Sequence, residues 1–288
     1  MERYDIAIIG TGPAGLEAAL TANARNKSIL LIGSRDLSVK VSKAHGILNY
    51  LGLPKVSGEA MAKVFKEQIA DAGIVITEGK VMYAYPMGDY FALQADYTDE
   101  IPEARTVILA TGLAQTKGLP GEDRFLGSGV SYCATCDARF YSGKKAIVVG
   151  YSPKEEEEAD FLSEIAAEVL YFPQYNEEVH TCDKVKVIKE SPAEIIGNMK
   201  AEALRTESGT YEADGIFILR ESIAPDKMVP GLALRDGHVE VNIDMETNIP
   251  GCFAAGDITG TPYQYIKAAG QGNVAALSAV SYIAKHSK

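Results

Sequence analysis

Short runs of consecutive apolar residues alternate along this chain with stretches of small and polar residues. Residues 4–10 (YDIAIIG) and 28–32 (SILLI) are continuous apolar runs, which are typical of parallel strands buried on both faces. Between them, residues 16–24 have the alanine- and leucine-rich spacing of a helix. The pattern therefore predicts a strand–helix–strand unit at the start of the chain.

The same pattern returns in the middle of the chain. Residues 145–150 (KAIVVG) predict a second buried strand, followed by a helix over about 153–167 and a strand over 168–172. A further apolar strand at 107–109 runs into Ala-Thr-Gly. Two such units in one chain predict an α/β fold.

We expect the C-terminal part of the chain to pack in the same domain as the N-terminal part. Residues 251–257 (GCFAAGD) precede a predicted helix over 263–285 that is rich in alanine and other small residues. Such a helix needs a closely packed neighbour, and we expect it to pack on the first unit. The first domain would then be discontinuous, over 1–113 and 245–288, with residues 114–244 inserted as the second domain.

Composition narrows the class of protein. The chain has 288 residues, a net charge of -11 and four cysteines. An acidic surface argues against nucleic acid or an anionic membrane as the main partner, and no apolar run approaches the ~20 residues that span a bilayer. The first strand begins too early for a secretion signal, and the cysteines are too few for a disulfide scaffold. We expect a cytoplasmic protein that binds neither nucleic acid nor membrane.

A glycine-rich turn follows the first strand directly. In residues 10–15 (GTGPAG), glycines stand where the chain turns, where a pyrophosphate meets the backbone and where the helix packs on the strand. The helix N-terminus would face the phosphates with free N–H groups. The usual acid about twenty residues on is missing, because Ser34 and Arg35 follow the second strand. We predict a dinucleotide site with a different mode of ribose recognition.

Cys133 and Cys136 enclose two residues and precede Asp137. Three interpretations compete: half of a zinc site, two buried structural thiols, or a redox-active disulfide. Zinc needs two further ligands, and the remaining cysteines and histidines lack ligand spacing. A CxxC pair lowers the pKa of one thiol and closes a short disulfide, and a neighbouring acid can relay protons. We favour the redox interpretation and expect no metal site.

The order of these motifs resembles that of the low-molecular-weight thioredoxin reductases: GTGPAG, ATG, SYCATCD, a second strand–turn–helix, and PGCFAAGDITG with an alanine-rich helix. The resemblance covers essentially the whole chain. It implies two Rossmann-like three-layer domains of the FAD/NAD(P)-binding type, with an inserted NADPH-type domain that carries the CxxC pair. It also implies FAD as cofactor, thioredoxin as acceptor and a homodimer.

The resemblance also implies individual roles. Cys136 would lie beside the flavin, Cys133 would attack the thioredoxin disulfide, and Asp137 would be the acid and base. Tyr265 departs from the family, which usually has glutamine there. By matched positions the FAD contacts would be Gly10, Gly12, Pro13, Ala14 and Gly15 at the pyrophosphate; Gly33, Ser34, Arg35 and Val81; Asn49, Ala110, Thr111 and Gly112 toward the flavin; Gly256 and Asp257 at the ribityl chain; and Gln264, Tyr265 and Ile266 near the isoalloxazine.

The inserted domain departs from the family at its nucleotide site. Its turn reads GYSPKE over 150–155 and keeps only the first glycine. Ser152 and Glu155 have the spacing of a capping box, and the following acids would repel a pyrophosphate. Residues 171–178 lack the basic side chains that hold the NADPH 2'-phosphate. NADPH binding should therefore be badly weakened.

This combination resembles the ferredoxin-dependent flavin thioredoxin reductases, which implies reduced ferredoxin as electron donor. Basic residues within 25–43, among them Lys40 and Lys43, would form its docking surface, unless they are an ordinary solvated face. Two alternatives remain open. The donor could be NADPH in an altered pose or a second flavin in the vacated site, or the chain could be a flavin-binding redox sensor without catalysis.

Overall fold

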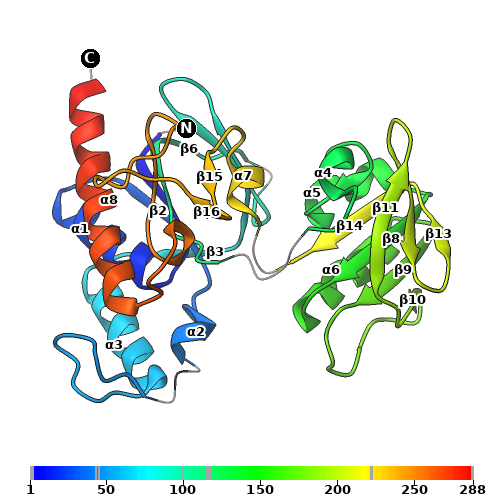
Figure 1. The fold of residues 1–288 in the computed structure, drawn as a ribbon, viewed down its shortest axis with the longest axis horizontal. Helices are drawn as coiled ribbons and strands as arrows, with labels where there is room; N and C mark the ends of the chain where they lie inside the picture. The colour runs from blue at the N-terminus through cyan, green and yellow to red at the C-terminus, as the bar shows by residue number, and fades with distance from the viewer. Residues whose placement is uncertain are drawn as a thin grey trace. The chain divides into compact units, whose positions relative to one another are not determined.

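The computed structural model describes residues 3–42, 44, 46–98, 100–113, 118–220 and 223–286, with the backbone alone for residues 39, 40 and 136. Of the expected docking residues, Lys43 lies outside the described residues, as does the side chain of Lys40. The chain divides into two compact units (Figure 1). Unit 1 is Met1–Leu113 with Ala224–Lys288, and unit 2 is Ala114–Ile223.

Unit 1 is built on a mixed sheet in the order β3-β2-β1-β6-β5-β4, with β17 paired to β6. The pairs among β1, β2, β3, β6 and β17 are parallel, whereas β4 and β5 form an antiparallel meander with β6. A small hairpin of β15 and β16 completes the unit. Its elements are β1 (Tyr4–Ile9), α1 (Pro13–Ala24), β2 (Ile29–Gly33), α2 (Val39–Ser42), α3 (Gly58–Asp71), β3 (Ile76–Glu78), β4 (Val81–Pro86), β5 (Phe91–Ala95), β6 (Glu103–Leu109), α7 (Pro225–Met228), β15 (Leu234–Arg235), β16 (His238–Val239), β17 (Cys252–Ala254), η3 (Asp257–Thr259) and α8 (Tyr265–His286).

Helix α8 packs along α1, as its small residues led us to expect (Figure 1). Where the two helices meet, a Cβ on Gly272 would lie 2.0 Å from the backbone oxygen of Ala14. Buried alanines of both helices share one core with the first strands of the sheet. The C-terminal helix is thus part of the dinucleotide-type unit.

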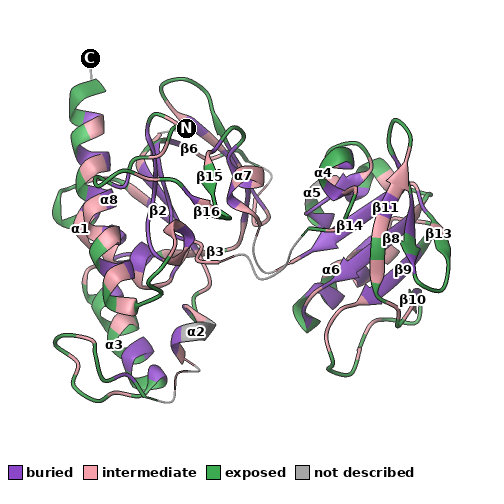
Figure 2. Cartoon of the chain, viewed as in Figure 1, coloured by how far each residue is buried: buried purple, intermediate pink, exposed green. Residues whose placement is uncertain are grey.

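Unit 2 contains a fully parallel sheet in the order β10-β9-β8-β14-β7 and an antiparallel sheet of β11, β12 and β13. Every residue of β14 is buried, and so are the interior residues of β8 and β9 (Figure 2). The elements are α4 (Glu122–Phe125), β7 (Val130–Ser131), α5 (Ala134–Asp137), η1 (Ala138–Tyr141), β8 (Lys145–Gly150), η2 (Pro153–Glu155), α6 (Glu156–Ser163), β9 (Glu168–Pro173), β10 (Val185–Val187), β11 (Pro192–Gly197), β12 (Ala201–Thr206), β13 (Thr210–Glu212) and β14 (Gly215–Leu219).

The α/β class predicted from the apolar runs is confirmed. The chain returns to unit 1 at Ala224, earlier than the expected residue 245. Residues 224–244 belong to unit 1 because α7 packs on β4 and β16 packs on η3. These short elements lack the long apolar runs on which our boundary depended.

In the part of the chain that the structure describes, no helix combines the length and the apolar character needed to cross a bilayer.

Candidate functional site

The first glycine-rich turn is shaped by close backbone contacts. Gly10 has a φ of +116°, and a Cβ there would lie 2.3 Å from the backbone oxygen of Ala110. A Cβ on Gly15 would lie 1.8 Å from the oxygen of Gly10. By contrast, a Cβ on Gly12 would have no nearer neighbour than Ser38 Cβ, at 4.0 Å. The turn is therefore tight where strand and helix meet and open at the helix N-terminus.

That open end suits an anion. Gly12 is the N-cap of α1 and supplies no side-chain cap, and Pro13 begins the helix. The first N–H groups of a twelve-residue helix thus point into the space beside Gly12 with the positive end of the helix dipole. These residues fit a dinucleotide pyrophosphate.

The two residues that follow β2 are hydrogen-bonded to this turn and to β3. Thr11 Oγ1 donates to the Ser34 oxygen at 2.8 Å. The Arg35 N–H donates to Glu78 Oε2 at 2.6 Å, and its Nε reaches the Ile76 oxygen at 3.4 Å. Glu78, which ends β3, was not among our candidates, because an acid this far along the chain has no sequence signal for the site.

The structure joins two of the residues expected at the flavin. Asn49 Nδ2 donates to Gln264 Oε1 at 2.8 Å, although the two are 215 positions apart. Beside them, Tyr265 packs against the small apolar cluster around Met61. Burial, and to a lesser extent Asp257, raises the pKa of Tyr265. Val81 begins β4, which is separated from β1 in the sheet by β6 and β5.

The turn that contains Gly256 and Asp257 is fastened by helix α8. Gln271 Oε1 accepts the Gly256 N–H at 3.0 Å, and Lys267 Nζ donates to the oxygens of Gly256 and Gly260 at 2.9 and 2.7 Å. Burial lowers the pKa of Lys267, against the opposing effect of Asp257. Lys267 and Gln271 were missed from the sequence, although their spacing of four places both on one helix face.

The cysteine pair lies between β7 and α5 of unit 2. Cys133 is disulfide-bonded and 6% exposed, whereas Cys182 and Cys252 are free. Cys136 lies within α5, and its side chain is outside the described residues. Cys252 is fully buried, which raises the pKa of its thiol to about 12.

Ser131 connects Cys133 with Asp137. Its hydroxyl donates to Asp137 Oδ2 at 2.6 Å and accepts the Cys133 N–H at 3.1 Å. Ser131 is 4% exposed. Ser131 opens the SYCATCD motif, but our candidates did not include it, since the motif does not show that its hydroxyl bonds to Asp137.

A buried ion pair is hydrogen-bonded to Tyr132, the residue that precedes Cys133. Arg220 donates to both Glu122 oxygens at 2.6 and 2.8 Å, and Tyr132 donates its hydroxyl to Oε1 at 2.8 Å. Burial alone would raise the pKa of Glu122, but the hydrogen bonds and charge of Arg220 lower it. Nothing in the sequence pointed to this pair, whose members are 98 positions apart.

In the turn of residues 150–155, protein atoms occupy the space beside Gly150. A Cβ on Gly150 would lie 2.2 Å from the Tyr171 hydroxyl. That hydroxyl lies 3.1 Å from the Tyr175 hydroxyl, which donates to Glu156 Oε1 at 2.5 Å. Glu156 Oε2 in turn accepts the His180 N–H at 2.8 Å. Burial raises the pKa of Tyr171 to about 12, so the phenol stays protonated at neutral pH.

The predicted capping box in this turn is wrong. Ser152 precedes η2 without a side-chain capping bond, and its buried Oγ has no hydrogen-bond partner among the residues that the structure describes. A 3-10 turn occupies Pro153–Glu155, so that α6 begins only at Glu156. Glu155 and Glu156 are 3% and 7% exposed. Buried carboxylates, rather than a serine cap, therefore take the N-terminal end of this helix.

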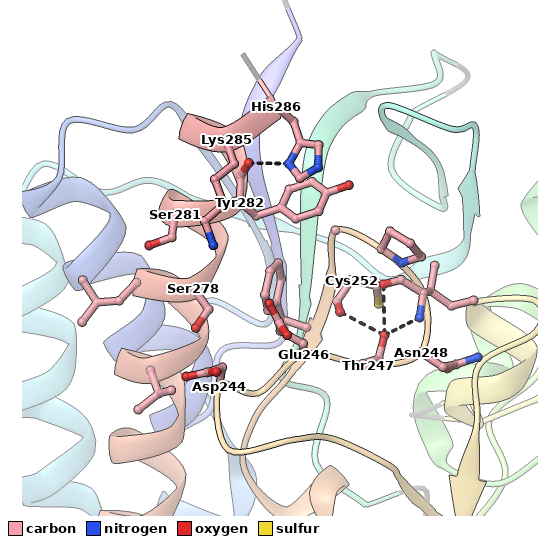
Figure 3. A pocket seen from close by; sticks show the side chains of 16 residues that line it. Asp244, Glu246, Thr247, Asn248, Cys252, Ser278, Ser281, Tyr282, Lys285 and His286 are labelled. Atoms are coloured by element: carbon pink, nitrogen blue, oxygen red, sulfur yellow. Dashed lines mark hydrogen bonds between the residues drawn. The ribbon is translucent and has the colours of Figure 1, made fainter. Parts of the chain in front are cut away.

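A cavity of about 700 Å³ lies elsewhere in unit 1, between the C-terminal half of α8 and the loop that leads into β17 (Figure 3). In this cavity Thr247 donates to the Cys252 oxygen, and Tyr282 stacks on His286. None of the expected cofactor contacts lines it. Over the described residues, no group of three or more His, Cys, Asp or Glu residues is arranged to hold a metal ion.

Residues 4–272 match the family model described as pyridine nucleotide-disulphide oxidoreductase. Thioredoxin reductases of Bacillus subtilis and Aquifex aeolicus are 30% and 31% identical, and the alignments cover 97% and 99% of this chain and 95% of each relative.

Solved structures are similar over the same length. A ferredoxin-flavin thioredoxin reductase from Clostridium acetobutylicum is 49% identical, with a TM-score of 0.92 over 99% of both chains. A thioredoxin reductase from Gloeobacter violaceus is 29% identical, with a TM-score of 0.80 over 99% of this chain and 96% of that one.

Proposed function

Because this chain belongs to the pyridine nucleotide-disulphide oxidoreductase family, and within it to the thioredoxin reductases, we propose that it passes electrons from reduced ferredoxin to thioredoxin. The route would be FAD bound to unit 1 and then a Cys133–Cys136 dithiol in unit 2. Unit 2 would then be an NADPH-type domain that has lost its nucleotide site.

The turn of residues 10–15 supports FAD as the cofactor. Its open helix N-terminus fits a pyrophosphate, and the Asn49–Gln264 pair offers amide groups to a flavin ring. Lys267 and Gln271 hold the backbone around Asp257, whose carboxylate suits a ribityl hydroxyl. When bound, the flavin would supply storage for two electrons that arrive singly and leave as a pair.

The choice of donor depends on one observation, the closed second turn. Tyr171 occupies the space beside Gly150, and Glu156 is buried at the helix end where a pyrophosphate would bind. Such an anion would meet a phenol and a carboxylate instead of free N–H groups. A protein donor needs no site in this turn. The Clostridium acetobutylicum protein that is 49% identical is named a ferredoxin-flavin thioredoxin reductase.

The energetics allow that donor. A ferredoxin near roughly -400 mV and thioredoxin near roughly -270 mV differ by about 130 mV. For two electrons this is about 6 kcal/mol downhill. The reaction would therefore run toward reduced thioredoxin without a nucleotide.

The thiol–disulfide exchange needs only the dithiol of unit 2 and the disulfide of thioredoxin. The Cys133 thiolate attacks one sulfur of the thioredoxin disulfide, breaking that bond and forming a mixed disulfide. Cys136 then attacks Cys133, so that the intramolecular disulfide forms and thioredoxin leaves as a dithiol. Two electrons and two protons pass to thioredoxin, and Asp137 would carry protons between thiol and thiolate.

Assembly and location are the remaining parts of the proposal. We propose a homodimer in the cytoplasm, and both rest on the resemblance to thioredoxin reductases. Sedimentation of the FAD-loaded protein at a monomer mass over the working concentration range would contradict the dimer.

An anaerobic titration tests the donor. Reduced ferredoxin should bleach the flavin of the loaded protein, NADPH should not, and thioredoxin disulfide should restore the colour. Rapid bleaching by NADPH would show that the donor is wrong, and absence of thioredoxin turnover with either donor would refute the reductase function.

Matched cysteine variants test the dithiol. Cys136→Ser should keep FAD bound but stop thioredoxin reduction. Cys182→Ser changes an exposed free cysteine of the same unit and should keep the wild-type rate. Turnover by Cys136→Ser would exclude the dithiol route.

A further inference from the structure

Ser131 contacts both Cys133 and Asp137 through its hydroxyl. Its hydroxyl has one proton and two acceptors within reach, Asp137 Oδ2 at 2.6 Å and the Cys133 oxygen at 3.2 Å. The shorter contact, to a carboxylate, is the stronger one. The proton therefore points at Asp137, and the serine oxygen remains free to accept the Cys133 N–H at 3.1 Å.

These bonds close a compact loop at the start of α5. The Cys133 oxygen accepts the Asp137 N–H at 3.3 Å, so backbone and side chain both connect the two residues. Ser131 is 4% exposed and sits at the end of β7, which the parallel pairing with β14 holds in place. The paired strand thus places Ser131 where it binds one carboxylate oxygen of Asp137, and among the described contacts the other oxygen has no hydrogen-bond partner.

We propose that Ser131 is a positioning residue for thiol–disulfide exchange, acting through Asp137. The inference rests on the proposed function. When a Cys133 or Cys136 thiol loses its proton, the Asp137 oxygen that Ser131 does not bind accepts it, and the same oxygen returns it to the departing thioredoxin thiolate. Ser131 takes no part in this proton balance. It keeps the carboxylate in one orientation while the sulfur atoms exchange partners.

A single-turnover experiment without the electron donor tests the role. FAD-loaded protein is reduced with dithionite and mixed with thioredoxin disulfide, and new thioredoxin thiols are trapped by alkylation over time. Ser131→Ala should lower the limiting rate about tenfold, as expected for one lost hydrogen bond to a charged group. The half-saturating thioredoxin concentration should stay the same, because the buried hydroxyl does not reach a partner.

Two further variants separate positioning from folding. Ser131→Thr keeps the hydroxyl and suits a strand, so its rate should return close to wild type. Ser152→Ala removes another buried hydroxyl of unit 2, one that bonds to none of the described residues, and should leave the rate unchanged. A Ser131→Thr rate as low as that of Ser131→Ala would overturn the proposal, because packing and not the hydroxyl would then matter.

A double-mutant cycle asks whether Ser131 acts through Asp137. In the Asp137→Asn background, Ser131→Ala should cost much less than tenfold, since the bond it removes no longer holds a carboxylate. An equal tenfold loss in both backgrounds would refute the positioning role. If ferredoxin fails as donor, the proposed route is wrong, yet this donor-free cycle still reports on Ser131.

Discussion

Arg220→Met would leave the Glu122 carboxylate buried without its guanidinium. The two side chains are 11% and 3% exposed, so solvent screens the pair very little. The substitution removes two charge-assisted hydrogen bonds of about 1.5–3 kcal/mol each. Only the Leu119 N–H and the Tyr132 hydroxyl remain as donors among the contacts described for this carboxylate. The expected cost is about 3–5 kcal/mol, the range measured for breaking buried pairs.

The pH dependence of that cost has a defined sign. In the wild type the folded pKa of Glu122 is lowered, so the stability it contributes is present above its unfolded pKa of about 4.3 and is lost as pH falls through the folded pKa. In the variant, burial without Arg220 raises the pKa of Glu122. The difference between the two proteins should therefore be largest near neutral pH and shrink toward about pH 4.

Hydrogen exchange measured by mass spectrometry reports the effect locally. Amides of β7 and β14 should lose about 3–5 kcal/mol of protection, while those of β1 and β2 in unit 1 serve as an internal reference. Glu122→Leu combined with Arg220→Met should recover most of the loss, because no buried charge remains. A loss below about 1 kcal/mol at neutral pH, or a loss independent of pH, would refute this account of the pair.

Three further outcomes follow from the geometry. Gly15→Ala puts a Cβ 1.8 Å from a backbone oxygen, so it should lower the flavin content of purified protein about tenfold or more, and normal content would contradict the tight turn. Lys267→Met removes the donor to two carbonyls of the turn at Asp257 and should weaken FAD binding roughly tenfold in an equilibrium titration, with unchanged affinity counting against its structural role. At neutral pH iodoacetamide should label exposed Cys182 quickly and buried Cys252 only after denaturation, as read by peptide mass spectrometry; equal labelling rates would contradict the raised pKa of Cys252.

The sequence predicted those strands whose burial on both faces requires a continuous apolar run. The runs at residues 4–9 and 145–150 coincide with β1 and β8, because strands buried on both faces need continuous apolar sequence. The helix expected over 153–167 ends at Ser163 instead. The Ala167 N–H donates to the Lys144 oxygen, and the Ile165 oxygen accepts the Gly143 N–H. Those bonds to a distant turn end the helix, and no local pattern encodes them.

In the candidate site, too, contiguous motifs could be predicted from the sequence and contacts between distant residues could not. The glycine turn and the CxxC pair are contiguous motifs, and the sequence identified both. The hydrogen bonds around them were not predicted. Arg220 and Glu122, whose carboxylate accepts the Tyr132 hydroxyl, are distant in sequence. The bond from Ser131 to Asp137 is not encoded by the motif that contains both. Tyr171 is a further example, since a buried strand tyrosine gives no sign that its hydroxyl will fill the space beside a glycine of the neighbouring strand.

The ion pair of unit 2 also has a topological consequence. The chain comes into unit 2 just before Leu119 and leaves it just after Arg220, and both residues donate to the same oxygen of Glu122 at 2.8 Å. The two ends of the unit are thus pinned side by side. A module with adjoining ends can be gained, exchanged or shed as a cassette while its host fold closes only a short gap. One carboxylate thereby closes the inserted unit at its base, with both bonds made inside unit 2.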